Sequence, residues 1–339
     1  MTAVLEETTM KKVVSLTSML SLLGSALVLS SCSLFGIRVD EYHFPDQGLR
    51  NAVSGYVDKD NNGYLSKEEL ESSKILPVWG PCYDLSGVEY LTNLETIGFN
   101  ECYDLSGIEK LTNLKKLDIS NTCPDLSAIE GLTNLEEINI ENCVFSDTFV
   151  FDNEVPVTDL VFRECAFENG FILNNDYVEK VEFGSQGFPT CEFSGDFVFT
   201  DCDALYEFNA SIDSEQGRNC NIDLSGCDNL DWFLICIETE QTITSVDLSN
   251  CSKLRSFSIY EFNKLNSVNK TEITINISGS PNIESVVLSE SINELDISDC
   301  PYLISASEQT PSEKNYGGLI YESDNGYIDT ENEQLVFIK

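Results

Sequence analysis

Three near-copies of one sequence occupy residues 84–143 and decide the fold. They read DLSGVEYLTNLETIGFNECY from Asp84, DLSGIEKLTNLKKLDISNTCP from Asp104 and DLSAIEGLTNLEEINIENCVF from Asp125, so the period is 20 and then 21 residues. A period of this length, with apolar residues at fixed places, is typical of repeats that stack into a solenoid. Because one repeat cannot bury its own apolar face, the neighbouring copies must shelter it.

Each copy carries apolar residues in the pattern L-x-x-L-x-x-L-x-L. In the second copy these residues are Leu111, Leu114, Leu117 and Ile119. The closing L-x-L alternates with polar residues, as a short strand with one buried face does. The stretch DLSGIEKLTNL, which precedes it, suits one or two helical turns on the convex side. The pattern therefore predicts an α/β solenoid with a ladder of parallel strands.

These residues resemble the leucine-rich repeat family, which implies an extended binding surface. We extend the ladder through weaker copies, among them IDLSGC ending at Cys227, VDLSNC ending at Cys251 and LDISDC ending at Cys300. This assigns residues 81–303 to leucine-rich repeats, roughly ten in number. Residues 304–339 lose the pattern, and their apolar segments predict a C-terminal hairpin cap built from Leu319–Tyr321 and Leu335–Ile338.

The N-terminus has the character of an export signal. Lys11 and Lys12 precede an apolar run without charges, which ends in the sequence Leu-Ser-Ser-Cys at Cys32. This ending resembles the lipobox of bacterial lipoproteins and implies a signal peptide over 1–31, a lipid on Cys32 and a tether over 32–42. The expected location is the cell surface, anchored by lipid to the cell membrane or outer membrane. The alternative is an uncleaved transmembrane helix, for which the apolar run is short.

Residues 58–69, DKDNNGYLSKEE, have the spacing of an EF-hand calcium loop. The side chains of Asp58, Asp60 and Asn62, the carbonyl of Tyr64 and the carboxylate of Glu69 would supply the oxygens that Ca²⁺ requires. The alternative is an Asp/Asn-rich turn that binds nothing, since turns favour these residues. With Phe44-Pro45-Asp46 ahead of it, the segment resembles the head of bacterial leucine-rich-repeat surface lipoproteins. We expect a helical EF-hand-like cap over 43–80 in which calcium is structural.

The chain contains 13 cysteines, most of them after strand-like segments at one place in the repeat. Such a place requires a small residue that packs inward, and a buried thiol behaves as a small hydrophobe. Parallel neighbours one strand apart rarely suit the disulfide dihedral angle, so free thiols are favoured. The cysteines outside this pattern, among which a disulfide is more plausible, are Cys191, Cys220 and Cys236.

The charge and composition exclude several function classes. The formal net charge is −39, which repels nucleic acid. There is one histidine, His43, and the sequence has neither a nucleophile–histidine pair nor a phosphate loop. We therefore expect a protein that is not an enzyme.

A binding module for a protein partner is the leading hypothesis, and a basic partner suits the acidic face. Trp232, Phe233 and Tyr260 are candidate aromatic anchors, although core or edge packing would also explain them. The alternatives are a structural coat lipoprotein without a specific ligand and a carbohydrate-binding surface protein. The outward strand positions predicted to face the partner are Asp118, Asn139, Asp247, Tyr260 and Asp296.

Overall fold

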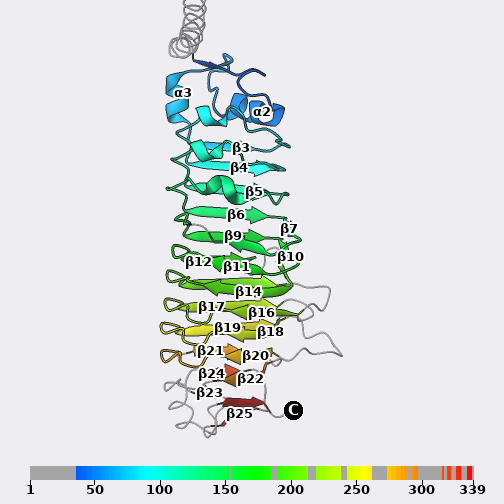
Figure 1. Ribbon diagram of the computed structural model, residues 1–339, viewed down its shortest axis with the longest axis vertical. Helices are drawn as coiled ribbons and strands as arrows, with labels where there is room; N and C mark the ends of the chain where they lie inside the picture. The colour runs from blue at the N-terminus through cyan, green and yellow to red at the C-terminus, as the bar shows by residue number, and fades with distance from the viewer. Residues whose placement is uncertain are drawn as a thin grey trace, which may run out of the picture.

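The chain forms a β-solenoid whose strands stack along the long axis of the molecule (Figure 1). The structure is a computed structural model, and it describes residues 36–152, 154–184, 190–212, 219–237, 243–261, 273–283, 285–288, 292–296, 315–316, 319–321, 326–329 and 334–337. Two long sheets run side by side down the stack, one of 12 strands and one of nine. The predicted ladder of parallel strands is confirmed.

The 12-stranded sheet continues the ladder that the three copies begin. Its order is β3 (Ile75–Val78), β4 (Thr96–Asn100), β5 (Lys116–Ser120), β6 (Glu137–Glu141), β9 (Asp159–Arg163), β12 (Lys180–Phe183), β15 (Glu207–Ile212), β17 (Trp232–Ile237), β19 (Ser256–Glu261), β21 (Ser285–Leu288), β24 (Leu319–Tyr321) and β23 (Asn315–Tyr316). All pairs are parallel except β23 with β24. The sheet thus begins at β3, ahead of the predicted repeat boundary at residue 81.

The nine-stranded sheet forms the second side of the later repeats. Its order is β8 (Phe149–Phe151), β11 (Phe171–Asn174), β14 (Gly195–Thr200), β16 (Cys220–Asp223), β18 (Ile243–Asp247), β20 (Ile273–Asn276), β22 (Ile292–Asp296), β26 (Gln334–Phe337) and β25 (Gly326–Asp329). A short third sheet joins β7 (Val144–Phe145), β10 (Ala166–Phe167) and β13 (Glu192–Phe193).

The first three copies carry 3₁₀ turns on the second side. These are η1 (Val88–Tyr90), η2 (Ile108–Lys110) and η3 (Leu126–Ile129). The α-helical part of the predicted α/β class is therefore wrong within the repeats. The physical reason is spacing: Leu105, Ile108 and Leu111 recur every three residues, which matches the three residues per turn of a 3₁₀ helix. Gly107 enters its turn at φ 112°, a conformation that suits glycine.

The core is one continuous apolar column inside the solenoid. Leu94, Leu114 and Leu135 are fully buried, as the stacked-repeat prediction requires. In the later repeats phenylalanine replaces leucine, and rings of successive strands stack, as Phe162 does on Phe183 at 5.2 Å between centroids. Aromatic pairs of this kind add stability beyond the area that they bury.

Two short helices cover the N-terminal end of the column. β1 (Ile37–Arg38) pairs antiparallel with β2 (Tyr64–Leu65), and the helices are α2 (Gln47–Tyr56) and α3 (Lys67–Ser72). Asp46 caps α2 by accepting a hydrogen bond from the backbone N–H of Leu49, at 2.9 Å. Its other carboxylate oxygen accepts from the N–H of Tyr83, at 3.0 Å, so this residue also joins the helical segment to the first repeat.

Three antiparallel strand pairs lie at the C-terminal end of the described residues: β23 with β24, β25 with β26 and β22 with β26. The two segments that predicted a hairpin lie in different sheets, since Leu319–Tyr321 is β24 of the 12-stranded sheet and Gln334–Phe337 is β26 of the nine-stranded sheet. β26 pairs instead with β25, so the strand that follows Leu319–Tyr321 supplies the missing partner.

The predicted signal peptide over 1–31 and Cys32 lie outside the described residues. Within the described ranges, no helix has both the length and the apolar character needed to cross a bilayer.

Candidate functional site

The outward side chains of the 12-stranded sheet form columns that run from repeat to repeat; we call this surface the outward face. Asp118 on β5 lies opposite Asn139 on β6, and the amide of Asn139 donates a hydrogen bond to Asp118 at 2.7 Å. Both side chains are partly exposed. These two predicted partner-surface residues therefore lie together on one face.

The other three predicted residues do not all join them. Tyr260 lies on β19 of the same sheet, whereas Asp247 and Asp296 lie on β18 and β22 of the nine-stranded sheet. The single column predicted from sequence is therefore not formed. The reason is that the sequence alignment of the later copies with the first three was shifted by half a repeat.

The segment IDLSGC around Gly226 corresponds to the DLSG that opens the early copies, rather than to the LDIS of β5. Gly226 has φ 79° and Gly107 has φ 112°, so a left-handed turn follows both Asp-Leu-Ser sequences. The strand of the 12-stranded sheet comes afterwards, at β17. For this copy the glycine after Asp-Leu-Ser was a sequence signal of the register, because glycine adopts positive φ without strain. The copy that contains Asp247 has Asn250 at this place, with φ 60°, and so lacks the signal.

Two tryptophans are exposed near the outward face. Trp232, at the start of β17, is 46% exposed, while its neighbour Phe233 is buried in the core. Trp79, which the sequence reading did not single out, is 72% exposed and directly follows β3. Its indole Nε1 donates a hydrogen bond to the hydroxyl of Tyr56 at 3.0 Å, which holds the ring in place.

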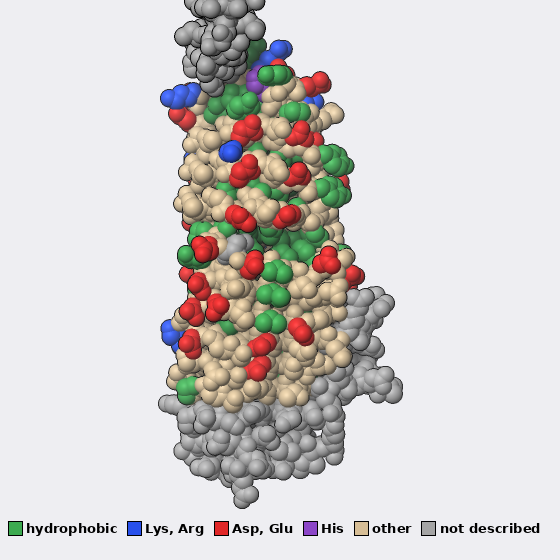
Figure 2. Space-filling model, in the orientation of Figure 1, with side chains coloured by type: hydrophobic (Ala, Val, Ile, Leu, Met, Phe, Trp, Pro, Cys, Tyr) green, Lys and Arg blue, Asp and Glu red, His purple; other side chains and the backbone are tan. Residues whose placement is uncertain are grey.

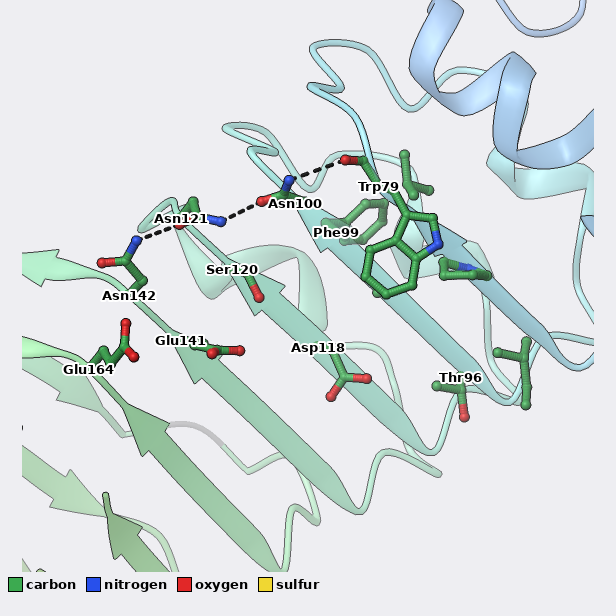
Figure 3. A pocket seen from close by; sticks show the side chains of 14 residues that line it. Trp79, Thr96, Phe99, Asn100, Asp118, Ser120, Asn121, Glu141, Asn142 and Glu164 are labelled. Atoms are coloured by element: carbon green, nitrogen blue, oxygen red, sulfur yellow. Dashed lines mark hydrogen bonds between the residues drawn. The ribbon is translucent and has the colours of Figure 1, made fainter. Parts of the chain in front are cut away.

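Trp79 forms one wall of a groove of about 410 Å³ across the N-terminal strands (Figure 3). We call it the Trp79 groove; the residues used below are Ile75, Pro77, Gly98, Asp118, Glu141 and Glu164. Gly98 lies between Pro77 and Asp118 in the strand register, and its missing side chain leaves the hollow. A β-carbon there would come no closer than 3.5 Å to the β-carbon of Asp118, which is ordinary contact.

An amide ladder fixes one side of the groove, as the dashed lines in Figure 3 show. Asn142 donates to the side-chain oxygen of Asn121, and Asn121 donates to that of Asn100. Asn100 in turn donates to the backbone carbonyl of Trp79 at 3.1 Å. The ladder connects Trp79 to three successive repeats. The groove is therefore preformed in the absence of a partner.

Charges on the outward face are partly paired. Lys116 Nζ lies 2.8 Å from Glu137 and 3.6 Å from Asp118, and Lys180 lies between Glu182 and Glu207 in the same way. Burial alone would lower the pKa of Lys116, but the two carboxylates outweigh it and raise the pKa. Figure 2 shows another side of the solenoid, the one that carries the 3₁₀ turns of the first repeats, and there too acidic side chains are many and lysines or arginines few.

Two carboxylates at the groove have no such partner. Within the described ranges, neither Glu141 nor Glu164 forms an ion pair. Both side chains are exposed, and both line the groove. Arg163 is the basic residue opposite Glu141 in the strand register, and it forms an ion pair with neither glutamate. The groove therefore carries two carboxylates that are not in ion pairs, beside an aromatic wall.

The predicted calcium loop brings its acidic residues together. Asp58, Asp60 and Glu69 each contribute one carboxylate oxygen to a cluster in which these oxygens lie within 4.8 Å of one another. Among the described residues, this is the one group of three or more acidic, histidine or cysteine side chains that could hold a metal ion. Asp58 is 3% exposed and Glu69 is 8% exposed. Asp58 accepts from the backbone N–H of Gly63 at 2.9 Å, which folds the loop around the carboxylates.

Glu69 ties the two ends of the loop together. It accepts from the N–H of Lys59 at 2.7 Å and from the N–H and hydroxyl of Ser66 at 2.8 and 2.7 Å. Burial alone would raise the pKa of Glu69, but these hydrogen bonds outweigh it and lower the pKa. The carboxylate is thus held ionised, and its oxygens suit a hard cation such as Ca²⁺.

The 11 described cysteines are not in disulfide bonds, and Cys191, Cys220 and Cys236 are among them. Ten are buried, and only Cys123 among them is exposed. Burial raises the pKa of Cys202 and Cys251 to about 12. These thiols stay protonated at neutral pH and fill the turn as small apolar groups.

Comparison with solved structures finds similar chains among the internalins. An internalin (inlF) from Listeria monocytogenes has 17% identity and a TM-score of 0.36, covering 86% of this chain and 99% of that one. Internalin C2 from the same organism has 17% identity and a TM-score of 0.35, covering 76% and 90%. The functional domain of InlJ, described as including a cysteine ladder, has 13% identity and a TM-score of 0.28, covering 89% and 92%. No protein-family model and no curated protein matches the chain.

Proposed function

We propose that this protein is a binding module for a protein partner, which it holds on the outward face of the 12-stranded sheet. The observation that carries the proposal is the exposure of Trp232 and Trp79 beside that face. Tryptophan is among the side chains that most often dominate the energetics of protein interfaces.

Binding rather than catalysis suits the chemistry of the face. His43, the single histidine, forms a 2.8 Å contact with Asp40 in the N-terminal segment and does not line the Trp79 groove. The face presents carboxylates and amides in columns, a pattern that suits recognition of a complementary surface.

The experiment is capture of surface proteins by the immobilised full chain, compared with two matched variants. Trp232→Ser removes a half-exposed side chain from the outward face. Val150→Ser removes one of similar exposure, 49%, from β8 of the other sheet. We expect Trp232→Ser to weaken capture and Val150→Ser to leave it unchanged. Equal capture by all three chains would favour the structural coat role.

A basic partner would make the capture sensitive to salt. Screening over about 8 Å at physiological ionic strength weakens attraction between exposed charges, and higher salt weakens it further. Release of the captured protein at high salt is the expected result, and retention would contradict the basic character of the partner.

We further propose that the segment 58–69 holds Ca²⁺ as an EF-hand-like site with a structural role. The donors Asp58, Asp60, Asn62, Tyr64 and Glu69 are all oxygen ligands, which suits this ion. The antiparallel pairing of β1 with β2 and the full burial of Leu65 support the role, because the loop is packed into the covering segment.

Lipid attachment at Cys32 is the third part of the proposal and places the solenoid at the cell envelope. It rests on the sequence Leu29-Ser30-Ser31-Cys32 after an apolar run. Cys32→Ser should release the protein from the membrane fraction. Retention of the variant in that fraction would contradict the anchor.

A further inference from the structure

The Trp79 groove combines an aromatic wall with carboxylates and a hollow. The hydrogen bond from the indole to Tyr56 fixes the edge of the ring and leaves most of its surface in solvent. Glu141 and Glu164 lie across the groove from the indole (Figure 3). Ile75 and Pro77 extend the apolar wall toward β3.

The charged groups that line the groove are all acceptors, the carboxylates of Asp118, Glu141 and Glu164. The amides of Asn100, Asn121 and Asn142 donate along the ladder or to the backbone of Trp79. Carboxylates at neutral pH accept hydrogen bonds and cannot donate them. A ligand that matches this groove must therefore bring donors, positive charge and a flat or apolar stem.

We propose that the Trp79 groove binds a basic segment of the protein partner, with one arginine or lysine side chain against the indole and another between Glu141 and Glu164. Arginine fits best, because its planar guanidinium suits both places: it stacks on an aromatic face and it donates to carboxylates. The net charge of −39 adds long-range attraction to such a partner. This inference rests on the proposed protein-binding function and names the chemistry at one end of its face.

A neutral sugar is the competing occupant, since exposed aromatic rings also stack on sugars. Sugar hydroxyls use donors as well as acceptors of the protein, and each amide of the ladder gives one of its two N–H donors to its neighbour. The unpaired carboxylates favour the cation. We therefore argue for the basic side chain and use the sugar as an outcome of the test.

The test is calorimetric titration of the full chain with tetra-arginine amide, using tetra-citrulline amide as the uncharged match. Tetra-arginine should bind and tetra-citrulline should not. The double variant Glu141→Gln/Glu164→Gln should bind tetra-arginine about 2- to 10-fold more weakly, and Trp79→Ala about 2- to 5-fold more weakly.

The matched control is Glu130→Gln/Glu136→Gln, which removes the same charge from exposed positions outside the groove. It separates the groove from the general field of an acidic protein and should leave the affinity nearly unchanged. Gly98→Val fills the hollow at a strand position whose added β-carbon meets only ordinary contacts. It should abolish binding while the melting temperature is kept.

Two results would overturn the inference. The first is an equal loss of affinity in the control and groove double variants, and the second is binding of neutral maltotriose with no response to tetra-arginine. If either occurs while Trp232→Ser still weakens partner capture, the inference fails and the proposed function stands. If tetra-arginine binds as expected but Trp232→Ser does not weaken partner capture, the inference about the groove is supported and the proposed function fails.

Discussion

The first three repeats and the later ones share one sheet but differ on the second side of the solenoid. In residues 84–143 that side is made of 3₁₀ turns, and in the later repeats it is made of the strands from β8 to β22. The spacing of apolar residues explains the difference. Leu105, Ile108 and Leu111 recur every three residues, whereas Phe149 and Phe151, like Phe171 and Leu173, alternate as strand residues do.

The comparison teaches that the two sides of a repeat can be specified independently. The inward residues of the shared sheet keep their register from Ile97 through Leu117 and Ile138 to Leu160, across the change of second side. The core adapts by exchanging leucine for phenylalanine. The phenylalanine rings, which are larger than leucine side chains, fill the space between the two sheets.

Removal of a ring from the phenylalanine core should have the largest effect. Phe183 is fully buried and packs on Phe162, Phe171 and Phe193 at 4.9–5.2 Å between centroids. Phe183→Ala should lower the free energy of unfolding by about 3–5 kcal/mol, because it leaves a large cavity. The matched change in the first region, Leu114→Ala, should cost less, since fewer atoms and no ring contacts are lost.

The measurement is urea unfolding followed by fluorescence. The chain has two tryptophans, one in each region, so Trp79→Phe and Trp232→Phe backgrounds report the regions separately. Equal losses for the two alanine variants would contradict the distinction between the two cores.

Replacing a left-handed glycine by alanine should cost more stability in the first region than in the later repeats. Gly87 has φ 100°, and a β-carbon there would lie 2.1 Å from the carbonyl oxygen of His43. Gly226 has φ 79° but nothing within 4 Å. Gly226→Ala should therefore cost about 1 kcal/mol from backbone strain alone. Gly87→Ala should cost about 2 kcal/mol or more, because the covering segment must move as well. Calorimetric melting of both variants checks the order, and a smaller loss for Gly87→Ala would refute the close approach.

Calcium should stabilise the N-terminal region selectively. An unpaired extracellular-type site binds at about 10⁻⁴–10⁻³ M, so a few millimolar Ca²⁺ should add about 1–2 kcal/mol to the stability of this end. Glu69→Gln should remove the response. Glu68→Gln, on the same helix but exposed, should keep it. Melting of each chain in EDTA and in calcium is the measurement, and an unchanged melting temperature in the unsubstituted chain would remove the calcium site.

The cap residue Asp46 should give the smallest effect, with a pH dependence. Asp46→Ala should cost about 1 kcal/mol, whereas Asp46→Asn keeps a capping side chain and should cost less. Burial alone would raise the pKa of Asp46, but hydrogen bonds from Tyr83 and Leu49 outweigh it and lower the pKa below its ordinary 3.8.

A lowered pKa in the folded state means that the contribution of Asp46 is present above pH 3.8 and lost as the pH falls through the folded-state value. The difference in unfolding free energy between the unsubstituted chain and Asp46→Ala should thus be constant near neutral pH and shrink in acid. A difference that grows as the pH falls would contradict this assignment.

Sequence reasoning predicted the stacked ladder because Leu94, Leu114 and Leu135 recur in nearly identical surroundings. It did not predict the second sheet. In the later repeats phenylalanine often occupies the inward positions, and the residues around it do not recur as a constant motif. The half-repeat shift had the same origin: the IDLS that begins on β16 and the LDIS of β5 look alike in letters but lie on different sides. The residue that follows differs, Gly226 in one case and Asn121 in the other, although both have positive φ.

The candidate site was predicted in part. Asp118 and Asn139 lie on the outward face, but Trp79 was missed because residues 75–78 were read as part of the N-terminal cap. The signal was present, since Leu76 and Val78 precede Ile97 and Phe99 by one repeat length and share their inward register. The groove itself could not be predicted, because it depends on Gly98 and on residues from four successive strands.

The central claim is that both regions belong to one sheet in continuous register, so that its outward face is a single surface. The direct measurement is the spin-label distance between positions 96 and 256, labelled through a keto amino acid to avoid the native cysteines. Seven strand steps separate β4 from β19. At the usual strand spacing the account predicts one narrow distribution near about 34 Å between backbones. A broad distribution, or a distance far from this value, would contradict a continuous sheet.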